Sequence, residues 1–195
     1  MYEYRDMTEA ERAKVLAGRK LHLRPWHAPP HFEQTAGTYL ISAACYEHRP
    51  ITSTEDRRTE WEMAVLDRLD QDIKIHAWVV LPNHYHLLME GGLAAFGRRI
   101  ARLHNGIATQ WNREDGTPGR KVWHRFSDRI LRSERHYYAS LNYIHANPVK
   151  HGHAAKADDW VWSSLSLYME MVGREQLGQW WRQYPVGNYG EGWDE

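Results

Sequence analysis

The stretch IKIHAWVVLPNHYHLLME, residues 73–90, decides how the fold is interpreted. Residues 73–80 are rich in β-forming side chains and predict a strand. Four of them alternate and are expected to share one face of it: Ile73, Ile75, Ala77 and Val79. Pro82 then forces a turn or a strand end. Residues 84–90 follow at once as a second strand, so the stretch predicts a β-hairpin.

The sequence before and after this hairpin supplies the other elements. A strand is expected over residues 38–44 and a helix over about residues 54–70, where apolar side chains recur on one stripe. A long amphipathic helix follows the hairpin, with its apolar stripe at Leu93, Phe96, Ile100, Leu103, Ile107 and Trp111. Residues 121–131 are expected to include a fourth strand.

The last predicted helix has recognisable ends. Ser133 is a good N-cap, and Pro148 is expected to stop the helix near Asn147. The resulting order β-α-β-β-α-β-α predicts an α+β fold, a ferredoxin-like (split βαβ) antiparallel sheet with helices on one face and a late helix that carries Tyr143. Around this domain, expected over residues 37–168, we expect an N-terminal extension (residues 1–36) and a C-terminal acidic tail (residues 169–195).

Composition limits the class of protein. The chain has 195 residues, enough for one domain with a core. No run approaches the roughly 18 apolar residues that a membrane helix needs, and the charged N-terminus is unlike a signal peptide. The single cysteine, Cys45, excludes an internal disulfide framework and a zinc site of several cysteines. These features predict a protein of the reducing cytoplasm that does not bind membranes.

The net charge of +0 hides a local asymmetry. Residues 98–135 contain ten basic and four acidic side chains, whereas residues 158–195 contain seven acidic and two basic ones. Ten Trp and eleven Tyr could supply flat partners for unpaired bases. Two interpretations stay open: a nucleic-acid groove, or a solvated basic face beside an acidic tail with the aromatic residues in the core.

Two histidines alternate along the predicted strand over residues 84–90. His84, His86, Leu88 and Glu90 would lie on one face, and Tyr85, Leu87 and Met89 on the other, core-facing side. Two imidazoles placed in this way can converge on one divalent cation, or they can simply line a half-buried face. A second His-x-His copy, residues 151–153, straddles a glycine and is a poor frame for fixed ligands.

The late helix presents a tyrosine on the same face as other polar side chains. Tyr143 and Asn147 are one turn apart, with Ser140 and His136 upstream on that face. A phenol with a pKa of about 10 is a poor nucleophile at neutral pH. A neighbouring metal ion could assist it by polarising a phosphate.

Residues 80–89 (VLPNHYHLLM) and residues 143–152 (YIHANPVKHG) together resemble the single-tyrosine HUH transposases, most closely the branch called REP-associated tyrosine transposases. Trp162-Ser163-Ser164 matches a short element that often follows in that branch. The resemblance covers roughly residues 37–168.

This resemblance implies a chemistry and its residues. His84 and His86 would bind Mg²⁺ or Mn²⁺, Tyr143 would be the nucleophile, and Asn147 would complete the metal shell or contact the phosphate. Such enzymes cut single-stranded DNA at hairpins or palindromic repeats, form a 5′-phosphotyrosine bond and free a 3′-hydroxyl. We expect a protein associated with the nucleoid, acting as a monomer or a homodimer. The basic residues expected to hold the DNA are Arg98, Arg102, Arg125 and Arg132.

Two alternatives keep the same residues but change the activity. The chain could be a domesticated, non-catalytic module that binds DNA hairpins, or a metal-dependent phosphodiesterase that uses water as its nucleophile. A purely structural protein would leave the co-occurrence of both motifs unexplained.

Overall fold

The computed structural model describes residues 36–69 and 73–190, together with Thr8 and Ala10. The predicted N-terminal extension, residues 1–36, lies outside the described residues except for Thr8, Ala10 and Ala36. The last five residues of the predicted acidic tail, 191–195, also lie outside them.

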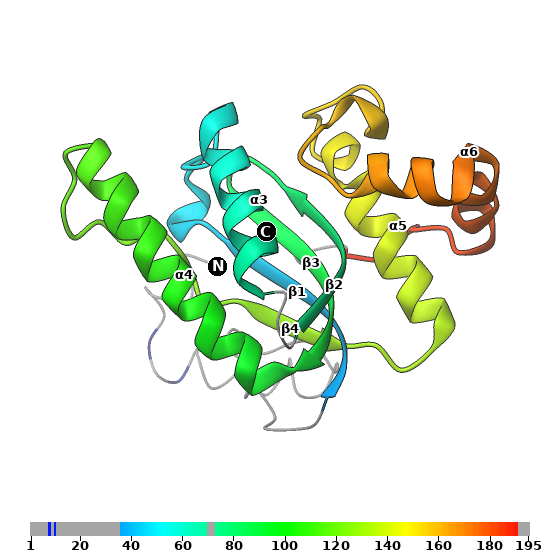
Figure 1. Cartoon of the computed structure of the whole chain (residues 1–195), viewed down its shortest axis with the longest axis horizontal. Coiled ribbons are helices and arrows are strands. Elements are labelled where there is room, and N and C mark those ends of the chain that lie inside the picture. Colours follow the sequence, from blue (N-terminus) through cyan, green and yellow to red (C-terminus); the bar gives the residue numbers. More distant parts are fainter. Residues whose placement is uncertain (1–7, 9, 11–35, 70–72, 191–195) are drawn as a thin grey trace.

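The described chain forms a four-stranded antiparallel sheet with helices on both faces (Figure 1). In chain order the main elements are β1 (Ala36–Ala44), α3 (Glu55–Leu69), β2 (Ile73–Val80), β3 (His84–Gly92), α4 (Leu93–Glu114), β4 (Ser127–Ile130), α5 (Glu134–Lys150) and α6 (Leu165–Gln183). The strands lie in the order β2-β3-β1-β4, and every neighbouring pair is antiparallel. This is the predicted ferredoxin-like α+β arrangement, which is thereby confirmed.

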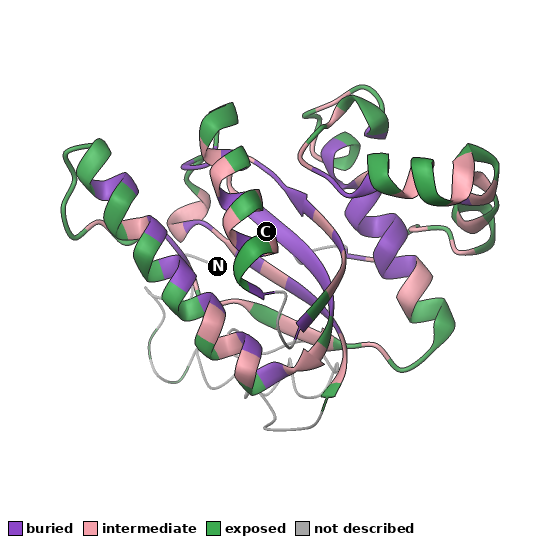
Figure 2. Ribbon diagram, viewed as in Figure 1, coloured by how far each residue is buried: buried purple, intermediate pink, exposed green. Residues whose placement is uncertain are grey.

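The sheet buries side chains on both of its faces. Helices α3 and α4 cover one face, where Tyr85, Leu87 and Met89 of β3 join the larger core cluster. Helix α5 covers the other face, against Leu40 and Leu88. Figure 2 shows the inner strands and the middle of α5 as the most deeply buried parts of the fold. The alternation predicted for residues 84–90 is therefore confirmed, and it directs His84 and His86 toward α5.

The two helices on the first face follow their predicted stripes. Trp61, Val65 and Leu69 of α3 are buried, and so is the whole predicted stripe of α4. No helix in the part of the chain that the structure describes has both the length and the apolar character needed to cross a bilayer.

The prediction that Ile73, Ile75, Ala77 and Val79 share one face is wrong. The pairing of β2 with β3 shifts between Ile75 and Ala77, so His76 is an extra residue in the ladder. Ile73 and Ile75 consequently pack on the α3 side, whereas Ala77 and Val79 pack on the α5 side. Such a bulge reverses which face each following side chain points to. The carbonyl oxygen of the inserted His76 accepts a hydrogen bond from the Tyr168 hydroxyl (3.0 Å).

The predicted end of the last helix is also wrong. Ser133 is the N-cap as expected and accepts a hydrogen bond from the backbone N–H of His136. The helix, however, continues through Pro148 to Lys150. Proline removes one backbone donor, but the turn is held because the amide groups of His151 and His153 donate to the carbonyl oxygens of Asn147 and Pro148 (3.0 and 2.8 Å).

The Trp162-Ser163-Ser164 element lies along the outer edge of β2. The Val80 amide donates to the Trp162 carbonyl (2.9 Å) and the Ser164 amide to the Trp78 carbonyl (3.0 Å). Helix α6 begins directly after it and was not identified from the sequence. Its buried Leu165 and Leu177 and the neighbouring Trp180 pack beside α5.

Two histidines are buried as neutral groups in the two halves of the core. His104 of α4 stacks on Trp123 (4.6 Å between ring centroids) and meets the Tyr85 hydroxyl at 3.0 Å. His145 of α5 meets the Ser164 hydroxyl at 3.0 Å. Burial disfavours the charged form and lowers the pKa of each imidazole to about 3, well below the usual 6.5.

This burial makes the fold sensitive to acid. Below pH 6.5 each of the two histidines becomes protonated in the unfolded chain, whereas in the folded chain both stay neutral down to about pH 3. The free energy of unfolding therefore falls as the pH is lowered from 6.5 to 3. Between pH 7 and pH 5 each histidine should remove about 2 kcal/mol from the free energy of unfolding. Urea titrations at both pH values measure the loss. In His104→Gln, the loss of unfolding free energy between pH 7 and pH 5 should be smaller by about 2 kcal/mol. In His136→Gln, a change at an exposed position, the loss should equal that of the wild type. An equal loss in all three proteins would contradict the buried, neutral state of His104.

Candidate active site

The two histidines predicted to bind a metal ion, His84 and His86, come from the middle of the sheet. Strand β3 lies between β2 and β1, with His84 opposite Ala44 and His86 opposite Ser42. Both side chains are buried, and their ring centroids are 5.0 Å apart. Because strands on both sides fix the backbone of β3, the two imidazoles are held on the face that α5 covers.

Each imidazole is oriented by a hydrogen bond at Nδ1 whose partner was not predicted from the sequence. Ser42 Oγ lies 2.7 Å from Nδ1 of His86, and Asn83 Oδ1 lies 2.7 Å from Nδ1 of His84. The Asn83 amide nitrogen in turn donates to the His48 carbonyl (3.3 Å). With Nδ1 occupied in this way, both rings direct Nε2 toward α5, and such outer partners commonly fix the orientation of metal-binding histidines. Ser42 could have been found only from the register between β1 and β3, which places it opposite His86 and which no single sequence motif shows.

Helix α5 brings the other two predicted residues to the same place. Tyr143 and Asn147 are fully buried on its inner face. The Tyr143 hydroxyl lies 3.4 Å from Nε2 of His86, and Asn147 Oδ1 lies 3.1 Å from Nε2 of His84. The structure therefore unites all four predicted residues: His84, His86, Tyr143 and Asn147.

The donor set suits a divalent cation. Asn83 Oδ1 accepts a hydrogen bond from Nδ1–H of His84, so in the neutral ring Nε2 carries a lone pair that faces the oxygen of Asn147. The amide nitrogen of Asn147 is buried without a hydrogen-bond partner in the structure. A cation held by His84, His86 and Asn147 would accept the lone pairs that now face one another. Among the described residues no group of three or more His, Cys, Asp or Glu side chains is arranged to hold a metal, so the asparagine amide is needed to complete this set.

A third histidine lies beside the pair. The ring of His151, at the C-cap of α5, is 4.9 Å from that of His84, and His153 lies 6.3 Å farther along. From the sequence, this second His-x-His copy is a poor frame for ligands. Helical spacing nevertheless brings His151 to the site, because position 151 is one further turn beyond Tyr143 and Asn147.

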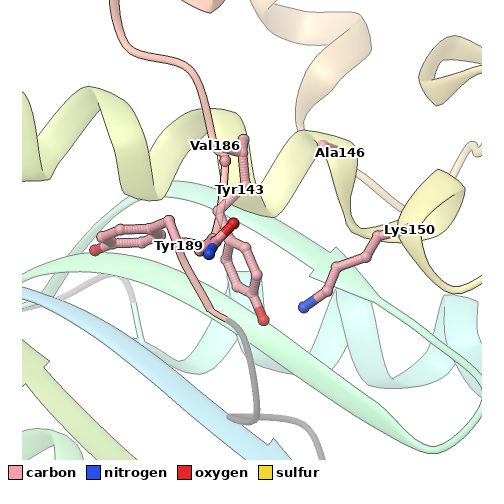
Figure 3. Close-up of a pocket in the computed structure, with 7 residues that line it drawn as sticks. Tyr143, Ala146, Lys150, Val186 and Tyr189 are labelled. Atoms are coloured by element: carbon pink, nitrogen blue, oxygen red, sulfur yellow. The ribbon is translucent and has the colours of Figure 1, made fainter.

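The segment that follows α6 covers Tyr143. Residues 186–189 and α5 enclose a pocket of about 240 Å³ beside the tyrosine, and Figure 3 shows Tyr189 flanking it. The Tyr189 hydroxyl bonds to Ser140 Oγ at 2.6 Å, and burial raises the pKa of Tyr189. Gly190 lies directly against the Tyr143 ring with a φ of +81°. Tyr143 is 0% exposed.

Lys150 places a cation next to the tyrosine. Its ammonium group lies 5.0 Å from the centroid of the Tyr143 ring and donates to the Gly190 carbonyl oxygen at 3.2 Å. In Figure 3 both side chains extend from α5 toward the sheet. Lys150, like Ser42, Asn83 and His151, was not predicted as a site residue from the sequence.

The four arginines predicted to hold DNA do not form one group. Arg98 of α4 and Arg125 line the same groove, between α4 and residues 120–126. Arg102 is exposed on α4 but is not among the residues lining that groove, and Arg132 is exposed in the link between β4 and α5.

Comparison with known proteins gives relatives of a single kind. The REP-associated tyrosine transposase of Escherichia coli (strain K12) is 33% identical over 132 residues, which cover 66% of this chain and 76% of the relative. A protein of Haemophilus influenzae (strain ATCC 51907), whose proposed name is the same, is 31% identical over 97 residues, or 44% of this chain and 55% of the relative. No model of a protein family matches the chain.

A solved structure also shares the fold. It is described as a REP-associated tyrosine transposase bound to a REP hairpin, and it superposes with a TM-score of 0.57 at 25% sequence identity. The match covers 77% of this chain and 87% of the other.

The contact between Gly190 and Tyr143 can be tested with one methyl group. A Cβ at position 190 would lie closer than 3.0 Å to three ring atoms of Tyr143, so Gly190→Ala should displace the covering segment. Tetranitromethane, followed by peptide mass spectrometry, should then nitrate Tyr143 several-fold faster. Gly187→Ala is the matched control, because Gly187 also has a positive φ but has space for a Cβ. Equal nitration of Tyr143 in both variants would contradict the covering role.

Proposed function

The chain belongs to the REP-associated tyrosine transposase family, and from that membership we propose that it cleaves and rejoins single-stranded DNA through a covalent bond to Tyr143. One observation carries the proposal: the Tyr143 hydroxyl lies 3.4 Å from the imidazole of His86, beside His84 and Asn147. The substrate class is hairpin or palindromic repeat DNA, in keeping with the hairpin bound to the related structure.

The proposed chemistry is the one that the family resemblance implies. The phenolic oxygen of Tyr143 loses its proton and forms a bond to phosphorus, while the bond from phosphorus to the 3′ oxygen breaks. The leaving 3′ oxygen takes up a proton, so the products are a 5′-phosphotyrosine and a free 3′-hydroxyl. Rejoining reverses the same steps. The phosphodiester energy is kept in the phosphotyrosine bond, and no nucleotide cofactor is needed.

A divalent cation, Mg²⁺ or Mn²⁺, would be held by His84, His86 and Asn147, where it would neutralise charge on the phosphate oxygens. Ser42 and Asn83 keep the two imidazoles directed at that position. Lys150 would add a second positive charge beside the Tyr143 ring, where its ammonium group now donates to the Gly190 carbonyl oxygen. Among the basic residues, Arg98 and Arg125, together with Arg102 and Arg132, would hold the DNA strand.

A second function is favoured by a specific observation. Tyr143 is fully buried beneath residues 186–190, which is what a non-catalytic hairpin-binding module would show if the segment never opened. The two proposals share a ligand and differ in whether a covalent adduct forms.

The nucleophile is tested by trapping the adduct. Full-length protein, Mn²⁺ and a labelled hairpin oligonucleotide with single-stranded flanks should give protein-linked DNA that survives denaturing electrophoresis. Tyr143→Phe removes the attacking oxygen and should abolish the adduct. Tyr138→Phe, on the same helix and stacked on Tyr184 away from the site, should form it like the wild type.

Each other outcome has a meaning. Adduct formation by Tyr143→Phe at the wild-type rate would show that another residue is the nucleophile. Cleavage with many turnovers and no protein-linked DNA would identify a water-dependent phosphodiesterase. Hairpin binding without cleavage under either metal would support the binding module.

The metal site is tested by binding rather than activity. Ser42→Ala removes the partner that orients His86 and should weaken Mn²⁺ binding by roughly 10- to 100-fold, measured by titration calorimetry. Ser127→Ala is the matched control, because Ser127 lies opposite Ser42 on β4 and bonds only to its backbone carbonyl (3.4 Å). Undiminished Mn²⁺ binding by Ser42→Ala would show that His86 does not depend on this contact or does not bind the ion.

A further inference from the structure

A row of aromatic side chains leads from the candidate active site to the surface. Ring centroids lie 4.9 Å apart from His84 to His151 and 6.3 Å apart from His151 to His153. Trp160 follows, 5.7 Å beyond His153. Exposure increases along the three histidines, because His84 is buried, His151 is half-buried and His153 is exposed. His153 and Trp160 belong neither to the proposed metal set nor to the segment that covers Tyr143, so the chemistry described above leaves them without a role.

The outer end of this row is held in place by the fold. The Trp160 indole N–H donates to the Val80 carbonyl oxygen (3.0 Å). The Arg58 guanidinium lies 5.0 Å from the centroid of the Trp160 ring and 3.9 Å from that of Trp162. Arg58 is itself buried and donates to the backbone carbonyl oxygens of residues 52 and 53 (3.1 and 2.6 Å). An indole fixed at its N–H beside a buried cation is a preorganised support for the His153 ring.

His153 presents a flat, uncharged ring at the surface. Burial, together with the neighbouring basic groups His151 and Arg58, lowers the pKa of His153 below its usual 6.5. The ring is therefore mostly neutral at pH 7 and has little charge with which to attract a phosphate. A neutral imidazole supported by an indole suits a flat partner instead, and the flat part of a DNA strand is an unpaired base.

Helix α5 arranges the candidate active site in a fixed order along its axis. Tyr143, Asn147 and His151 are one turn apart from each other, about 6 Å of axial rise for each turn. Tyr143 lies at His86, Asn147 lies at His84, and His151 lies beyond, against the His84 ring. A cation held by the first two histidines and Asn147 would therefore have Tyr143 on one side and His151 on the other.

The direction of attack decides which part of the DNA would meet the aromatic row. In phosphoryl transfer, the attacking and leaving oxygens lie roughly in line on opposite sides of phosphorus. With Tyr143 attacking from its end of the site, the leaving 3′ oxygen would point toward His151. The nucleotide that carries this oxygen, and that keeps the free 3′-hydroxyl after cleavage, would then lie beside His153.

We propose that His153, supported by Trp160, stacks on the unpaired base of the nucleotide that leaves with the free 3′-hydroxyl. The inference rests on the proposed function, because it takes DNA as the ligand and Tyr143 as the attacking group. It deepens that function by naming the residue that retains the released end without a covalent bond. A 3′-hydroxyl retained in this way stays close to the phosphotyrosine, which rejoining requires.

The stacking contact is tested by binding, under conditions in which no cleavage occurs. Every protein is full length and carries Tyr143→Phe. The probe is a labelled hairpin with single-stranded flanks, in which one flank nucleotide at a time is replaced by an abasic sugar. Fluorescence anisotropy with Mn²⁺ should find a position at which loss of the base weakens binding roughly tenfold. Adding His153→Ala should remove that penalty at this position alone, because the base then has no ring to stack on.

Two further variants separate stacking from effects on folding. His153→Tyr keeps a flat ring at the position and should restore the penalty for the abasic sugar. His136→Ala is the matched control, because His136 is also an exposed histidine but lies in the first turn of α5, and it should leave the abasic profile unchanged. In proteins that retain Tyr143, His153→Ala should release the cleaved 3′-hydroxyl strand several-fold faster than the wild type, measured by a chase with unlabelled DNA.

The outcomes distinguish this inference from the catalytic proposal. A profile in which no position responds to His153→Ala overturns the stacking site even if the Tyr143 adduct forms. An adduct whose mapped cut places the responsive base on the strand joined to Tyr143 also overturns it. A penalty lost in His153→Ala and regained in His153→Tyr supports stacking even if no adduct is found, in which case the catalytic proposal alone fails.

Discussion

The packing of α5 against the His84–Leu88 face of β3 is the contact on which the candidate site depends. Leu40 and Leu88 of the sheet and Leu141 and Ile144 of the helix form one buried cluster that also includes Tyr143. Because these side chains fix the helix against the strands, Tyr143 has little freedom to leave its histidine neighbours. The apolar cluster thus provides the rigidity that the proposed reaction would need. Neither the histidines nor the tyrosine could supply it alone.

Periodic side chains made much of this arrangement predictable. Tyr85, Leu87 and Met89 are apolar at alternate positions, which assigned His84 and His86 to the opposite face without any knowledge of the fold. The heptad-like stripe of α4 and the N-cap at Ser133 were equally local signals. The meeting of His86 with Tyr143, 57 positions apart, came from the family resemblance and not from any local pattern.

The wrong predictions each have a physical reason in hydrogen bonds that the sequence rules leave out. The bulge at His76 and the continuation of α5 beyond Pro148 both break a local rule, the first at a tertiary contact and the second at hydrogen bonds within the last turn of the helix. Tyr168 satisfies the carbonyl of His76, and the amide groups of His151 and His153 complete the last turn. The role of Ser42 was hidden for a related reason, since only the register between β1 and β3 places it at His86. The contacts of Tyr168 with His76 and of Ser42 with His86 join residues from separate elements, so no short window of sequence contains both partners. The hydrogen bonds beyond Pro148 are local, but the rule that proline ends a helix does not include them.

The position of residues 162–164 has a consequence for how copies of the chain meet. An outer strand with unpaired amide and carbonyl groups is a template onto which another chain can add a strand. The hydrogen bonds from Val80 to Trp162 and from Ser164 to Trp78 occupy those groups along the later half of β2. At the other side of the sheet, β4 has only four residues, and Asp128 and Arg129 among them are charged. Both edge strands of the sheet are therefore protected against aggregation: residues 162–164 cover the later half of β2, and β4 is short and charged.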